Sequence, residues 1–188
     1  MPGGAWTRLG VTLLAAALVL MLATLSAGAA PAEPATDPGA ADPTQQTLPL
    51  PDPTSRARST LTEDVVRLTN AARAQEGLAP LRPNDALMKS AQDYAVALAP
   101  GDCFAHDCPP VPAQRDRIAQ AGYGGWKRIG ENIAAGDRTA EAVMAGWLDS
   151  PGHRANILRP EYTEIGVGVA TGTGKYGTYW VQVFATPS

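Results

Sequence analysis

The chain has 188 residues, of which 45% are hydrophobic and 18% charged, and its formal net charge is −3 at pH 7. This length supports one domain with additional segments but not two full domains. The slight acidic excess and the lack of a Lys/Arg-rich run argue against a nucleic-acid partner, because neutralising phosphates needs clustered cations.

Residues 1–29 have the pattern of a secretory signal peptide. Arg8 supplies a positive charge, Val11 to Leu25 form an almost unbroken apolar run, and Ala27-Gly28-Ala29 matches a cleavage site. A retained anchor helix is the alternative, although the run is shorter than the roughly 20 residues that cross a bilayer. We therefore expect a secreted, extracellular protein without a transmembrane segment in the mature chain. Association with the cell envelope is a second destination to consider.

Residues 30–59 predict a disordered linker. They contain seven prolines among Ala, Thr, Asp and Gln. Proline prevents helix and central-strand formation, and almost nothing in this stretch can form a core. The foldable domain is accordingly expected to span residues 60–188.

Helices are predicted over much of the first half of this domain. Thr60 and Glu63 fit a capping box at a helix start, and Gly77 suits the stop of that helix. Asn84 is a favourable N-cap for a second helix, which Pro100-Gly101 ends. One apolar stripe follows along that helix: Leu87, Ala91, Tyr94, Ala95 and Leu98.

The later elements change from helices to strands. Helices are predicted over 115–121 and 139–149, followed by a turn or two of helix over 153–158. Three apolar residues near 165–169 alternate with Gly166 and Gly168, which indicates close approach of another chain segment. Residues 179–184 carry apolar bulk on both faces, as in a strand covered by helices on two sides. The pattern predicts an α+β fold.

The chain has two cysteines, Cys103 and Cys108. In an exported protein such a pair most simply forms a disulfide, with two free thiols as the alternative. A ring this small should stabilise the whole fold only modestly, and would mainly hold the loop that contains His106.

Three polar residues are candidates for chemistry. His106 and His153 are the two histidines of the chain, and Glu131 lies in the segment Gly130-Glu131-Asn132-Ile133. Spacing alone does not show that they converge, and a histidine in a loop is usually an ordinary hydrogen-bonding group. Ser150, three residues before His153, raises the alternative of a serine–histidine dyad, but no orienting acid is identifiable.

Several sequence blocks resemble the signature blocks of the CAP superfamily of cysteine-rich secretory, antigen 5 and pathogenesis-related proteins. They are Gly130-Glu131-Asn132-Ile133, the run from Ser150 to Leu158, Gly166-Val167-Gly168, and the run from Tyr179 to Phe184. The blocks keep their order over roughly residues 60–186, and the compact form without a cysteine-rich extension is similar to bacterial members.

The resemblance implies a three-layer α-β-α sandwich with an antiparallel central sheet and an open cleft. In the family the cleft holds two histidines and two acids, and the histidines can bind a divalent metal. His106 and His153 match the histidines, so they are the expected metal ligands for Zn²⁺ or another divalent cation, and Glu131 matches one acid. The place of the second acid is Ser150, which leaves the set incomplete. Four residues are expected to support the cleft: Glu131, Asn132, Ser150 and Arg154.

The favoured function is a non-enzymatic extracellular domain, expected to be a monomer, whose cleft binds a small or lipid-like ligand or an extracellular partner. The first alternative is a metal-assisted hydrolase acting on peptide or cell-envelope material, with His106, Glu131, His153 and Ser150 as candidate catalytic residues. The second is an adhesive or structural module. Fold alone does not decide among them.

Overall fold

The computed structural model describes residues 53–188. The expected signal peptide and residues 30–52 of the expected linker lie outside this range. In chain order the elements are α1 (Pro53–Gln75), β1 (Arg82–Pro83), α2 (Asp85–Leu98), α3 (Gln114–Gln120), β2 (Trp126–Ala135), α4 (Ala140–Asp149), α5 (Pro151–Ile157), β3 (Glu164–Thr171) and β4 (Thr178–Pro187).

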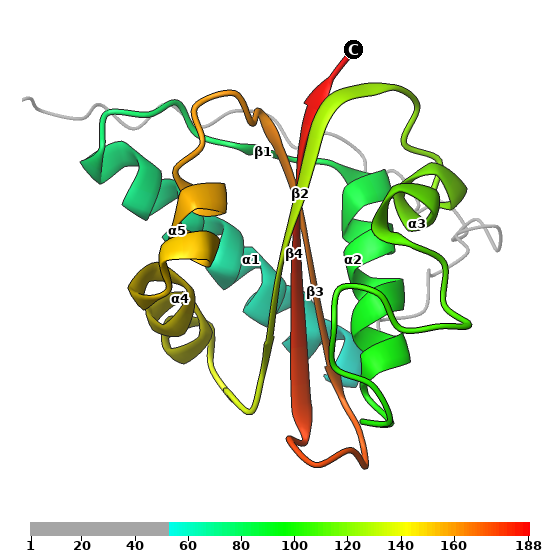
Figure 1. Ribbon diagram of the computed structural model, residues 1–188. Helices are drawn as coiled ribbons and strands as arrows, with labels where there is room; N and C mark the ends of the chain where they lie inside the picture. Colours follow the sequence, from blue (N-terminus) through cyan, green and yellow to red (C-terminus); the bar gives the residue numbers. More distant parts are fainter. Residues whose placement is uncertain (1–52) are drawn as a thin grey trace, which may run out of the picture. The chain divides into compact units, whose positions relative to one another are not determined.

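The four strands form one sheet in the order β1-β3-β4-β2. β4 pairs antiparallel with both β3 and β2, and the two-residue β1 adds a parallel pairing at the other side of β3. In Figure 1 the sheet is seen nearly edge-on, with α1, α4 and α5 on one side and α2 and α3 on the other. The predicted α-β-α sandwich is confirmed, and β2 is a strand that the sequence patterns did not reveal.

β4 supplies apolar side chains to two cores. Tyr179, Val181 and Val183 belong to the core beneath α2, whereas Trp180 and Phe184 belong to the core beneath α1 and α4. All five are at most 1% exposed. Successive side chains of a strand point to opposite faces, so a middle strand with a helical layer on each side must be apolar on both.

The glycines of β3 let α2 approach the sheet closely. A Cβ atom on Gly166 would overlap the backbone of Leu87, and one on Gly168 would overlap the backbone of Ala91. The expected close approach is confirmed, and the approaching segment is α2.

α1 begins earlier than predicted, at Pro53 instead of Thr60. The capping box was therefore wrong: Thr60 lies inside the helix, and its hydroxyl donates to the carbonyl of Arg56 at 3.1 Å. Residues 53–59 belong to α1 and not to the linker. Proline is well tolerated in the first turn of a helix, so Pro53 marks a start and not a barrier. Gly77, with φ of 70°, follows the end of α1 as expected.

The other helices lie close to their predicted positions. The Asn84 side chain accepts hydrogen bonds from the first amides of α2, and the apolar stripe of that helix is buried. α5 begins at Pro151, two residues before the predicted start at His153, because proline suits the first helical position. Only Ser150 separates α4 from α5.

Candidate functional site

His106 and Glu131 form the centre of the candidate site. Nδ1 of His106 lies 2.9 Å from Oε1 of Glu131, and the imidazole is 57% exposed while the carboxylate is only 3% exposed. The predicted disulfide between Cys103 and Cys108 is present and closes the loop that carries His106. Glu131 is held in the middle of β2, where it is paired with Val183 of β4. A short covalent ring and a sheet strand thus bring the two groups together.

Arg117 of α3 holds both partners of this pair. Its Nη2 donates to Oε2 of Glu131 at 2.6 Å, and its Nη1 donates to the carbonyl of His106 at 3.3 Å. The guanidinium lies 3.4 Å from the ring centroid of Tyr94, a cation–π contact, and its side chain is only 6% exposed. Sequence reasoning missed Arg117, because nothing in the local pattern distinguishes it from a surface arginine, and it gave Tyr94 no role in the site.

His153 lies on α5, in the opposite helical layer. It is half-buried in α5, and its carbonyl accepts a hydrogen bond from Nδ2 of Asn132 at 3.1 Å. Burial lowers the pKa of His153, and the neighbouring charge of His106 lowers that pKa further.

The two histidines are tuned in opposite directions. The hydrogen bond to Glu131 raises the pKa of His106, against the opposing effect of burial. The contact with Glu131 and the burial of His153 thus move the two pKa values in opposite directions.

Hydrogen bonds among three buried polar side chains and the half-buried Asn156 join α1, β4, β2 and α5. Gln182 donates to Oγ1 of Thr69 at 2.8 Å and accepts from Nδ2 of Asn132 at 3.0 Å. Asn156 in turn donates to Oδ1 of Asn132 at 2.9 Å. Asn132, which was expected to support the cleft, also donates to the backbone carbonyl of His153.

Ser150 and Arg154 do not join the His106–Glu131 pair. Ser150 is the single residue between α4 and α5, and its carbonyl accepts from the amide of Arg154. The Arg154 side chain instead forms a half-exposed ion pair with Glu76 at 2.9 Å. Within residues 53–188 no hydrogen bond joins the side chains of Ser150 and His153, so no contact supports a serine–histidine dyad.

A metal site with three protein ligands does not fit these residues. Within residues 53–188, no group of three or more His, Cys, Asp or Glu side chains is arranged to hold a metal ion. Both oxygens of Glu131 are already engaged, one by His106 and one by Arg117. Two imidazoles alone leave at least two positions of a tetrahedral ion to water, which makes a weak site.

A groove lies away from the His106–Glu131 pair, and sequence reasoning missed it. A groove of about 620 Å³ is bordered by the first turns of α1, the last turns of α2, the end of β3 and the hairpin leading to β4. Its apolar lining includes Leu61, Val96, Val169 and Tyr176, and its cations are Arg58 and Arg138. We call it the α1–α2 groove. None of His106, Glu131 or His153 lines it, so the histidine site and the groove are separate features.

Exposed apolar side chains gather beside this groove. Val96 and Tyr176, which line it, are 56% and 45% exposed, and Phe104, which packs on Tyr176 with ring centroids 5.8 Å apart, is 41% exposed. These three are the large hydrophobic residues that residues 53–188 leave exposed. Clustered exposed apolar surface commonly marks a binding site.

Comparison with known proteins establishes the family. The model of the CAP family, described as the cysteine-rich secretory protein family, matches residues 66–184, and the chain belongs to this family. The resemblance seen in the sequence blocks is thereby confirmed, together with the bacterial type of the domain.

Several similar proteins are bacterial. An uncharacterized protein of Bacillus subtilis (strain 168), YkwD, is 36% identical over 166 residues, which cover 83% of this chain and 62% of the relative. An extracellular SCP-domain protein from Bacillus anthracis str. Ames has a TM-score of 0.63 at 28% identity, over 74% of this chain and 45% of that one. An outer surface protein of Borrelia burgdorferi shares the fold, with a TM-score of 0.60 at 22% identity over 67% of this chain and 94% of that one.

The chain spans less than two thirds of the length of YkwD. None of the helices within residues 53–188 combines the length and the apolar character that crossing a bilayer requires.

Proposed function

We propose that this protein is an extracellular ligand-binding CAP domain that works without chemical turnover, and that the α1–α2 groove holds a lipid-like molecule with an anionic head. The observation that carries the proposal is the composition of the groove. Its volume of about 620 Å³ lies within the range of small-molecule sites, and apolar side chains from three elements line it.

The charge of the groove specifies the head group. Arg58 and Arg138 border it, and no Asp or Glu of the described range is among its lining residues. Apolar walls bury a hydrocarbon chain, while arginine side chains bind a carboxylate or phosphate through paired N–H donors. An uncharged lipid would bury the same apolar surface but leave this positive charge without a partner.

Binding of laurate and of dodecanol, measured by titration calorimetry, tests this proposal. The two molecules have the same chain length and differ in the charge of the head. We expect the wild type to bind laurate more tightly than dodecanol. The Arg58→Gln/Arg138→Gln double variant should lose this preference but still bind dodecanol.

A second pair of variants locates the binding. Ala57 is an exposed residue of α1 that lines the groove, whereas Ala74 is exposed on the same helix but does not line it. Ala57→Trp should weaken laurate binding at least tenfold by filling the groove, and Ala74→Trp should leave it unchanged. Equal binding by both variants would place the ligand elsewhere and defeat the proposal.

A hydrolase remains the second candidate because one observation favours it. A buried acid orients His106 through a 2.9 Å contact, as an acid orients the general base of many hydrolases. The described residues supply no activated nucleophile beside it. Turnover of a peptide or cell-wall fragment that disappears in both His106→Ala and His153→Ala would favour this alternative over ligand binding.

A further inference from the structure

One end of the domain combines exposed apolar side chains with unpaired cations. The last turns of α2, the first turns of α1 and the hairpin between β3 and β4 meet at this end, which is the lower one in Figure 1. We define the hairpin-end patch as the exposed apolar residues found there and the cations beside them: Val96, Phe104, Tyr176, Arg58, Arg138 and Lys175.

Two aromatic rings form the centre of this patch. Phe104 comes from the disulfide loop and Tyr176 from the hairpin, with ring centroids 5.8 Å apart. The ammonium group of Lys175 lies 5.3 Å from the centroid of the Tyr176 ring. Aromatic rings beside lysine or arginine are typical of surfaces that contact lipid headgroups, because the rings enter the apolar boundary while the cations stay among the phosphates.

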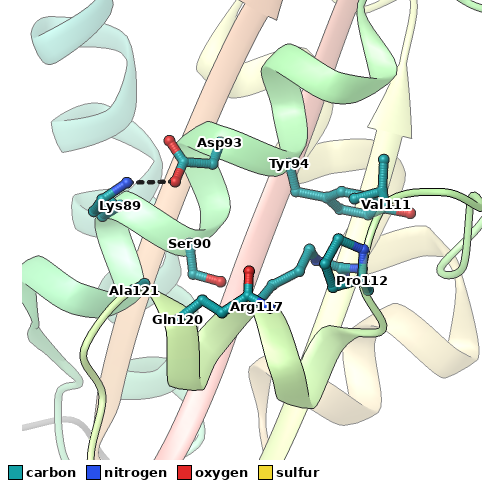
Figure 2. Close-up of a pocket in the computed structure, with 9 residues that line it drawn as sticks. All are labelled: Lys89, Ser90, Asp93, Tyr94, Val111, Pro112, Arg117, Gln120 and Ala121. Atoms are coloured by element: carbon teal, nitrogen blue, oxygen red, sulfur yellow. Dashed lines mark hydrogen bonds and ion pairs between the residues drawn. The ribbon is translucent and has the colours of Figure 1, made fainter.

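The cations of the hairpin-end patch lack carboxylate partners. Among residues 53–188, none of Arg58, Arg138 and Lys175 forms an ion pair. Elsewhere on the surface a cation can be neutralised by a neighbour, as Lys89 is by Asp93 at 2.6 Å beside the small pocket between α2 and α3 that Figure 2 shows. The unpaired cations leave the patch complementary to an anionic surface.

Two acids lie close to this patch in the sequence. Asp102 precedes Phe104 by two residues, and Asp137 directly precedes Arg138. Neither acid forms an ion pair within the described part of the chain, and the described lining of the groove contains no Asp or Glu. The cations of the patch outnumber these two acids, so its local charge is positive although the whole chain carries −3.

We propose that the hairpin-end patch docks on an anionic lipid bilayer, with Phe104 and Tyr176 entering the headgroup boundary and the cations contacting lipid phosphates. A stable protein–protein interface buries roughly 800 Å² on each partner, more than three partly exposed apolar side chains supply. A bilayer needs only a few inserted apolar side chains with cations nearby, so it fits this small patch better. The α1–α2 groove shares Val96 and Tyr176 with the patch. A docked bilayer would therefore also be a source of the groove's ligand, and this further step rests on the proposed function.

Fluorine NMR of the full-length protein tests the docking at a single side chain. The chain has two phenylalanines, the 41% exposed Phe104 and the fully buried Phe184, so labelling with fluorinated phenylalanine gives a probe and an internal control. The vesicles contain phosphatidylcholine alone or mixed equally with phosphatidylglycerol, each with and without a spin-labelled lipid. In the mixed vesicles, the spin label should remove the Phe104 signal and leave the Phe184 signal. In phosphatidylcholine alone, both signals should persist.

Two lysine variants show whether the patch is responsible. Lys175→Gln should raise the concentration of mixed vesicles that halves the Phe104 signal about fivefold, the effect of one cation near an anionic surface. Lys127 is also exposed, but it lies near the start of β2, whereas the end of β2 at Ala135 pairs with Tyr179 beside the hairpin. Lys127→Gln removes the same charge from the other end of the sheet and should leave this concentration unchanged.

The outcomes separate docking from binding in the groove. Lys175 does not line the α1–α2 groove, so Lys175→Gln should bind laurate as the wild type does when vesicles are absent. Failure of laurate binding would thus count against the proposed function and not against docking. A Phe104 signal that persists in all spin-labelled vesicles overturns the docking proposal and makes a protein the partner to test on this surface. Equal loss of that signal with and without phosphatidylglycerol overturns it too.

Discussion

Glu131 and Asn132 are consecutive residues of β2 whose side chains serve opposite faces of the sheet. Glu131 contacts His106 and Arg117 on the α2–α3 side, and Asn132 contacts Gln182 and the carbonyl of His153 on the α1–α5 side. Because β2 is the last strand of the sheet, both helical layers can present a histidine around its edge. One dipeptide thereby organises both halves of the site.

The buried pair of Glu131 and Arg117 leads to a stability prediction. Arg117→Met should lower the free energy of unfolding by roughly 3–5 kcal/mol, because it leaves the carboxylate buried without its partner. The double variant Arg117→Met/Glu131→Met should be less destabilised than this single variant, since neither charge remains. Urea unfolding of both variants provides the measurement. If the loss of unfolding free energy in the double variant equals the sum of the losses in the two single variants, the two side chains act independently.

Packing of α2 against β3 leads to a second prediction. Gly166→Ala should destabilise the fold by about 1–3 kcal/mol or more, because the new methyl group meets the backbone of Leu87 and not a movable side chain. Gly146→Ala is the matched control: it lies in α4, and an added Cβ meets nothing within 4 Å. That change should stabilise by about 0.5–1 kcal/mol through helix propensity. In thermal unfolding, Gly166→Ala should lower the midpoint temperature and Gly146→Ala should raise it.

The pKa of one histidine should lie above the usual imidazole pKa and that of the other below it. Proton NMR should give His106 a pKa above 6.5 and His153 a pKa below it. In His106→Gln the pKa of His153 should rise, because a positive neighbour is lost, but stay below 6.5, because burial is the larger cause. An unchanged His153 titration in this variant would mean that the imidazoles do not interact.

The raised pKa of His106 also fixes the sign of a pH effect on stability. A group whose pKa is higher in the folded state contributes stability that is complete below its unfolded pKa near 6.5 and is lost as pH rises through the folded value. Wild type should therefore exceed His106→Gln in stability at pH 5.5 and lose this margin as pH rises through the folded pKa of His106. The imidazole is more than half exposed, so the margin should be under about 1 kcal/mol.

Zinc titration provides the remaining prediction. With both Glu131 oxygens engaged, only the two imidazoles are available, so calorimetry should show weak binding that His106→Ala and His153→Ala each remove. Heat that saturates alike in all three proteins would exclude these histidines as ligands. Tight binding by wild type would mean that Glu131 exchanges Arg117 or His106 for the ion.

Sequence patterns predicted the elements whose signals are local. The Asn84 cap, the stripe of α2 and the two-faced apolar pattern of β4 each depend on residues close in the chain, and each is found in the structure. The start of α1 was misplaced because a capping box can also occur inside a helix, where Thr60 donates backwards to Arg56.

The same distinction between local and long-range information applies to the candidate site. The family resemblance made His106, Glu131 and His153 candidates, but Arg117 approaches Glu131 only after α3 folds against α2, and no local pattern carries that information. The α1–α2 groove was missed for a similar reason. Its lining comes from α1, α2, β3 and the hairpin, which are separated by many residues in the sequence.

The two histidines are anchored in different ways, and the one-residue junction at Ser150 bears on His153 alone. His153 is held by α4 and α5 together, and its own carbonyl is fastened to Asn132. His106 instead rides on a six-residue ring that faces solvent. The position of His153 is therefore set by the packing of its helix, and that of His106 by the disulfide ring together with Arg117 and Glu131.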